Sequence, residues 1–89
     1  MDKILKQDPP ALRLFALERL GGSKRSGLAR AALKFFRDPA PEVRIAAMRA
    51  AYRLDKKTIA SIRAMMRDPD RRVTRAAQRM VRRHDAEHK

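Results

Sequence analysis

The sequence predicts an all-α protein, a short right-handed α-solenoid of antiparallel helix pairs with about five helices. Three observations support this fold class. Residues 38–47 (DPAPEVRIAA) return as residues 68–77 (DPDRRVTRAA), with Asp, Pro, Val and both Ala at an offset of 30. An Asp-Pro pair precedes several predicted helices, and the helix predicted after Asp38 has two apolar stripes. A fixed period of this size is typical of stacked helical hairpins.

The first repeat unit is predicted over about residues 1–22. A short N-terminal piece at about 2–7 precedes a helix from about Pro9 to Leu20, which Gly21 and Gly22 are expected to end. This second helix contains the repeated pattern with one residue removed, because Leu12-Arg13 corresponds to Val43-Arg44.

The second unit is predicted over about residues 23–54. Its first helix follows Ser23–Ser26 and ends near Arg37. Asp38 is expected to be the N-cap of the next helix, with Pro39 in its first turn, where the missing N–H is tolerated. That helix is expected to continue to about Leu54.

Two apolar stripes are predicted on this helix at about 100° per residue. One consists of Val43, Ala47, Ala50, Ala51 and Leu54, and the other of Ile45, Met48 and Tyr52. Arg44 lies between the stripes, whereas Arg49, Arg53 and Glu42 lie on the polar side. A helix with two apolar stripes must be covered on two sides, as in the middle of a solenoid.

The third unit is predicted over about residues 55–84. Asp55 is expected to cap a helix over 56–67, and Asp68-Pro69 to start the last helix, which ends near His84. The polar tail at 85–89 is expected to fray.

Composition restricts the partners. The 89 residues carry a formal net charge of +13, and arginine outnumbers lysine, which favours phosphate or carboxylate ligands. The absence of cysteine excludes disulfides and thiolate chemistry. No apolar run approaches the roughly 20 residues of a membrane span, and the N-terminus lacks the apolar core of a signal peptide. We therefore expect a cytoplasmic protein without a membrane span.

The pattern Asp-x-x-x-x-Val-Arg-x-x-Ala, complete at residues 38–47, resembles HEAT-like repeats of the short, roughly thirty-residue type, such as those of phycobilisome lyase-like proteins. The resemblance covers about residues 8–84 and implies a single repeat domain. It also implies that motif Asp and Arg side chains form a structural ladder between neighbouring repeats. The ladder residues would be Arg13, Asp38, Arg44 and Asp68, and Thr74 replaces the arginine in the last copy.

Seven arginines recur on the helices that would line the concave face of such a solenoid. They are Arg49, Arg53, Arg72, Arg75, Arg79, Arg82 and Arg83. The leading interpretation is a surface that binds nucleic acid, DNA or structured RNA, through phosphate contacts without sequence readout. The alternatives are a protein–protein adaptor that holds an acidic partner, and a charged face that only contacts solvent.

No catalytic constellation is present, so we expect a non-enzymatic binding module without cofactor, metal or small-molecule substrate. HEAT-like DNA glycosylases are longer, and the tryptophan-rich cleft expected of one is impossible in a chain without Trp. Phe15, Phe35, Phe36 and Tyr52 are expected to pack in the core, and the Tyr52 hydroxyl could reach the concave face. The pair His84 and His88 could hold a metal, but the third ligand is missing.

Overall fold

The computed structural model describes residues 9–88, and the short N-terminal piece predicted over 2–7 lies outside them. Within this range the chain forms five α-helices and no strand, as expected for an all-α fold. The α-helices are α2 (Pro10–Gly22), α3 (Ala29–Leu33), α4 (Pro41–Leu54), α5 (Ile59–Ala64) and α6 (Arg71–Glu87). Short 3-10 helices extend α3 and α5 at both ends: η1 (Ser26–Leu28), η2 (Lys34–Arg37), η3 (Lys56–Thr58) and η4 (Met65–Arg67).

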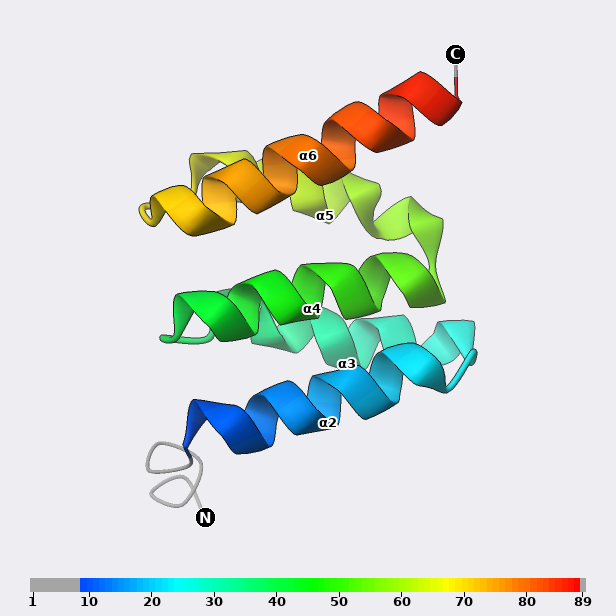
Figure 1. Cartoon of the computed structure of the whole chain (residues 1–89). Coiled ribbons are helices and arrows are strands. Elements are labelled where there is room, and N and C mark those ends of the chain that lie inside the picture. The colour runs from blue at the N-terminus through cyan, green and yellow to red at the C-terminus, as the bar shows by residue number, and fades with distance from the viewer. Residues whose placement is uncertain (1–8, 89) are drawn as a thin grey trace.

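The helices form two layers. The long helices α2, α4 and α6 lie side by side in one layer, and the shorter α3 and α5 lie behind them (Figure 1). The molecule is flat, with extents of 45 × 30 × 16 Å. α2 packs on α4, α4 packs also on α3 and α6, and α6 packs also on α5, so the contacts join successive repeats and confirm the short all-α solenoid.

Both predicted stripes of α4 face the core. Val43, Ala47 and Ala51 of the first stripe are completely buried, and Met48 of the second is buried as well. Ile45 and Tyr52 are partly buried against the same cluster. The alanines leave little side chain between helices, so the backbones approach closely, and α4 becomes the helix that joins α2 and α3 to α6.

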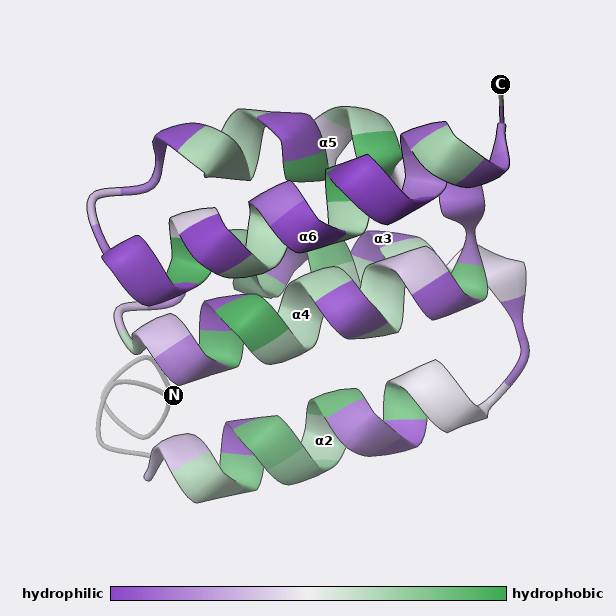
Figure 2. Ribbon diagram, turned by 45° about the horizontal axis from the view of Figure 1, so that its top comes forward, coloured by the Kyte–Doolittle hydropathy of each residue, from purple (hydrophilic) through white to green (hydrophobic). Residues whose placement is uncertain are grey.

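Phe15 is the exception among the aromatic residues. Phe36 is buried and Phe35 and Tyr52 are partly buried, but Phe15 is 58% exposed, so its predicted place in the core is wrong. Leu12 is also 58% exposed, although its counterpart Val43 is completely buried. The packing of the two helices differs within the described residues. α3 precedes α4 and packs against it, whereas no helix precedes α2 within residues 9–88. Green segments on α2 mark its apolar residues (Figure 2).

The Asp-Pro pairs lie just outside the helices, so the predicted N-caps were wrong. The N-caps are Ala40 for α4 and Asp70 for α6. Pro41, not Pro39, occupies the first turn of α4. Asp38 instead forms a turn, because its carboxylate accepts the N–H of Ala40. Asp55 does cap its helix, by accepting the N–H of Lys57.

The turn after α2 also differs from the prediction. The helix continues through Gly21 and Gly22, and the residue with a left-handed backbone is Lys24, with φ of 62°. Gly21 has a packing role instead, since a Cβ atom there would lie 3.3 Å from the Cα of Ala50. The glycine therefore permits close contact between α2 and α4.

The last helix is longer than predicted. α6 continues to Glu87, so residues 85–87 belong to the helix rather than to a frayed tail. Asp85 forms an ion pair with Arg63 of α5, and the rings of His84 and His88 stack with centroids 4.1 Å apart. These contacts stabilise the final turns. No helix in the described part of the chain is long and apolar enough to cross a membrane.

Candidate binding groove

An open groove of about 800 Å³ crosses the layer of long helices. Its lining comes from α2, α4 and α6 and consists of Leu14, Leu17, Glu18, Gly21, Ala46, Arg49, Ala50, Tyr52, Arg53, Ala76, Arg79, Met80 and Arg83. Because all three long helices contribute, the groove exists only when the repeats are stacked.

The lining on α4 recurs on α6 at the offset of 30 residues. Ala46 and Ala76 correspond, as do Ala50 and Met80. The arginine pair Arg49 and Arg53 is repeated as Arg79 and Arg83. Within each pair the residues are four apart, so they lie on one face of the helix. The groove therefore has two arginine pairs, separated by small or apolar side chains.

The α2 side of the groove has different chemistry. Glu18 stands where the pattern of α4 has Arg49, and Leu14 and Leu17 supply apolar surface. In the described part of the chain, no carboxylate lies within 4.0 Å of the four groove arginines. The groove thus presents exposed, uncompensated guanidinium groups beside an apolar floor.

Tyr52 contributes to the groove wall but is not free to turn outward. Its hydroxyl lies 2.8 Å from Nδ1 of His84 on α6, and the two rings meet edge to face with centroids 5.7 Å apart. This contact joins α4 to α6 beside the arginine pairs. His88 does not extend it to a metal site, and no group of three potential metal-ligating side chains occurs among the described residues.

The remaining predicted binding residues lie outside the groove. Arg72 is engaged by Asp70, whose carboxylate accepts from Nε at 3.2 Å and from Nη2 at 3.1 Å. The hydrogen bond from Arg72 lowers the pKa of Asp70 below its ordinary value. Arg75 and Arg82 are exposed and do not line the groove. The structure therefore divides the seven arginines between a groove, an ion pair and a separate surface.

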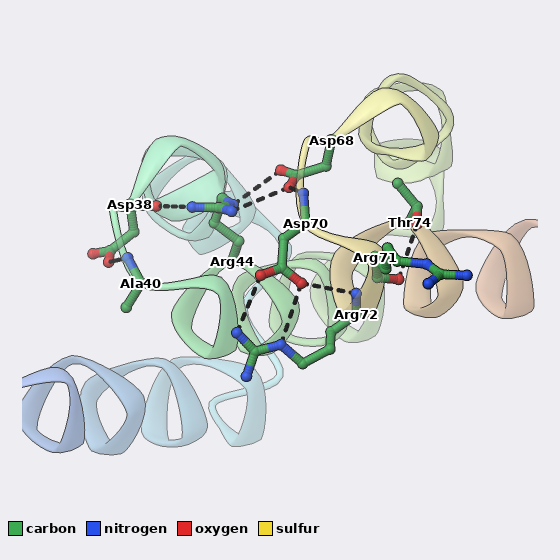
Figure 3. Close-up of polar contacts among 8 residues, drawn as sticks. All are labelled: Asp38, Ala40, Arg44, Asp68, Asp70, Arg71, Arg72 and Thr74. Carbon is green, nitrogen blue, oxygen red and sulfur yellow. Dashed lines mark hydrogen bonds and ion pairs between the residues drawn. The ribbon is translucent and has the colours of Figure 1, made fainter.

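The four ladder residues form two equivalent ion pairs between repeats. Arg13 of α2 donates to Asp38 from Nε at 2.6 Å and from Nη2 at 3.1 Å. Arg44 of α4 contacts Asp68 from Nε at 2.9 Å and from Nη2 at 3.1 Å. All four side chains are mostly buried. Figure 3 shows how Arg44 reaches from one loop to the next.

The ladder ends at Thr74. This residue replaces the motif arginine, and its hydroxyl donates to the carbonyl of Arg71 within its own helix (Figure 3). The ladder therefore fixes the spacing of α2, α4 and α6, and the groove across them depends on it.

The apolar floor of the groove was not part of the predicted site. Leu14, Ala46, Ala76 and Met80 were not identified as lining residues, although the recurrence of Ala46 and Ala76 next to the arginine pairs was visible at offset 30. The link between Tyr52 and His84 left no such signal, because His84 has no histidine counterpart in the preceding repeat.

Comparison with known families agrees with this geometry. The family model described as HEAT repeats matches residues 2–82 of the chain. No curated protein and no solved structure matches the chain.

Proposed function

Because this chain belongs to the HEAT-repeat family, whose members generally mediate protein–protein interaction or scaffolding, we propose that it is a scaffold module that binds an acidic, amphipathic segment of a partner protein. The binding site is the groove across α2, α4 and α6. One observation carries the proposal: an apolar floor lies between two pairs of uncompensated arginines. HEAT repeats are typically non-catalytic, in keeping with a binding role.

The two kinds of surface have different roles in binding. Burying a Leu-sized side chain of the partner on the floor contributes about 1.5–3 kcal/mol. An exposed ion pair contributes only about 0.2–1 kcal/mol. The floor therefore supplies most of the affinity, whereas Arg49, Arg53, Arg79 and Arg83 accelerate association and select acidic partners.

The groove suits a protein segment better than a phosphate backbone. A nucleic-acid backbone has no apolar group to cover Leu14 and Met80. An amphipathic helix satisfies both surfaces at once, since it presents apolar residues on one side and carboxylates beside them. The leading nucleic-acid interpretation is for this reason not proposed for the groove.

Fluorescence anisotropy with two labelled peptides tests the proposal. One is an amphipathic Glu/Leu helix, and the other replaces each Leu by Ser and keeps the charge. The proposal requires tight binding of the first peptide and at least tenfold weaker binding of the second. Arg49→Gln with Arg79→Gln should weaken the first peptide, and Met80→Ser should do so without any change in charge.

Three results would contradict the groove as a protein-binding site. The first is equal binding of the two peptides, which would mean that only charge matters. The second is binding that Met80→Ser leaves unchanged. The third is duplex DNA binding that the arginine double variant abolishes, which would restore phosphate contacts at the groove. Arg30→Gln with Arg37→Gln, on the opposite layer, is the charge-matched control.

A further inference from the structure

The outer edge of α6 is a second arginine surface, distinct from the groove. We define this outer edge as Arg71, Arg75, Gln78 and Arg82. All four residues are exposed, and none of them lines the groove. Within residues 9–88, α6 is the last helix of the layer, and its outer edge faces away from α4 (Figure 1). Figure 2 shows the helix as largely hydrophilic.

The positions of the outer edge of α6 carry different residues in α4. Ile45, Met48 and Tyr52 form the stripe of α4 on the side of α6, and Tyr52 contacts His84 there. At offset 30 these three positions are Arg75, Gln78 and Arg82. The side of α4 that packs on the next helix is therefore apolar, whereas the same side of α6 is charged. A further repeat could not pack on α6 in the way that α6 packs on α4.

A polar end is expected of any solenoid, because terminal repeats need a soluble outer face. A face needed only for solubility would carry charges of both signs. The charged residues of this edge, as defined above, are all arginines. The acids within three residues of them are engaged elsewhere, since Asp68 pairs with Arg44, Asp70 pairs with Arg72, and Asp85, which continues the stripe after Arg82, pairs with Arg63. No acidic side chain in the described residues lies within 4.0 Å of Arg71, Arg75 or Arg82.

We infer that the outer edge of α6 binds the phosphate backbone of double-stranded DNA, without reading bases. The helix has 17 residues, which corresponds to about 25 Å at 1.5 Å per residue. B-form DNA carries one negative charge per roughly 1.7 Å of axis, so the edge faces many phosphates. Arginine suits such a surface because its planar guanidinium can bind a phosphate through two hydrogen bonds.

The shape of the edge favours DNA over duplex RNA. The major groove of B-form DNA is about 12 Å wide and admits one α-helix, whereas that of A-form RNA is too narrow for side chains to read. α6 is packed against α4 and α5, so only its outer edge is accessible to the major groove. This surface is separate from the groove, and the inference does not depend on the occupant of the groove.

The salt dependence of binding to a mixed-sequence duplex of 20 base pairs is the test. Three phosphate contacts give a slope of log K against log salt of about −2.7, which is an affinity loss of about 40-fold between 50 and 200 mM salt. The triple substitution of Arg71, Arg75 and Arg82 by Gln should remove most of this slope. Circular dichroism and a thermal melt check that the variant remains folded.

Two variants with the same loss of charge are the controls. One replaces the groove arginines Arg49, Arg53 and Arg79 by Gln, and the other replaces Arg30, Lys34 and Arg37 of the opposite layer. In both control variants, the slope of log K against log salt should keep at least two thirds of its value in the unmodified protein. If all three variants lose DNA binding equally, general charge accounts for it and the inference fails. It also fails if the groove variant alone loses binding.

Two further probes separate DNA from other polyanions. If poly-glutamate loses as much affinity as DNA in the outer-edge variant, the edge is a surface for acidic proteins and not for DNA. If an RNA duplex of the same length binds as tightly as the DNA and loses as much in the variant, the assignment to DNA is overturned. A loss of affinity for DNA that is larger than the losses for poly-glutamate and for the RNA duplex supports the inference.

Discussion

Arg44 and Asp68, which are 24 residues apart in the sequence, form a two-point contact between neighbouring repeats. Nε of Arg44 lies 2.9 Å and Nη2 lies 3.1 Å from the Asp68 carboxylate oxygens. The third nitrogen, Nη1, donates to the backbone carbonyl of Asp38 at 2.6 Å. One guanidinium therefore connects the loop before α4 to the loop before α6, and Asp68 also accepts the N–H of Asp70.

The first prediction concerns this contact. Arg44→Ala leaves the mostly buried carboxylate of Asp68 without its cation, so it should lower the free energy of unfolding by about 2–3 kcal/mol. Arg49→Ala is the control, because it is the same change in the same helix at an exposed position, where about 0.5 kcal/mol or less is expected. Urea unfolding measures both. Equal values for the two variants would show that the ladder contributes no stability.

The second prediction compares two phenylalanines. Phe36→Ala removes a buried ring and should cost about 3–5 kcal/mol. Phe15→Ala removes a ring that is 58% exposed and contacts the guanidinium of Arg19 at 5.7 Å, so it should cost less than about 1 kcal/mol. Thermal melts of both variants suffice. A Phe15→Ala cost close to that of Phe36→Ala would place Phe15 in the core after all.

These two phenylalanines also show what could be predicted from the sequence and what could not. The helical period identified the buried stripe of α4, and the repeated motif, with one residue removed in its first copy, identified the pattern that Arg13 and Arg44 share, because period and register are properties of the chain itself. Burial of Phe15 depends on which helix covers α2, and a periodic pattern does not contain that information. Arg75 lies outside the groove for a different reason, because it occupies the position of Ile45, which does not line the groove on α4 either.

The third prediction concerns the pH dependence of Asp85. The hydrogen bond from Arg63 lowers the pKa of this carboxyl below its ordinary value and raises the pKa of Arg63. A lowered folded-state pKa contributes stability that is present above the unfolded-state value of about 3.9. This contribution is lost as the pH falls through the lower folded-state pKa.

Carboxyl NMR titration measures this shift. In Arg63→Gln the pKa of Asp85 should rise back toward its ordinary value. Asp70 is the internal reference, because its pKa is lowered mainly by Arg72 and should stay where it is. If Asp85 titrates identically in the variant, then Arg63 is not the cause of the lowered pKa.

The fourth prediction concerns the contact that joins α4 to α6. Tyr52→Phe keeps the ring and removes the hydroxyl that meets Nδ1 of His84, so it should cost about 1 kcal/mol. His84→Ala loses the ring contact as well and should cost more. Chemical denaturation of the single and double variants gives the coupling energy. Additive single costs would mean that the two side chains do not interact.

The ladder also makes the length of this protein adjustable. Each ion pair joins an arginine of one unit to an aspartate in the loop of the next unit. If a second copy of residues 38–67 were inserted after residue 67, the Asp38 of that copy would follow Arg44 at the same distance in the sequence as Asp68 does now. Such a duplication would keep each existing contact and add one rung. It would also add a third arginine pair, a copy of Arg49 and Arg53, so that the groove could hold a proportionally longer ligand.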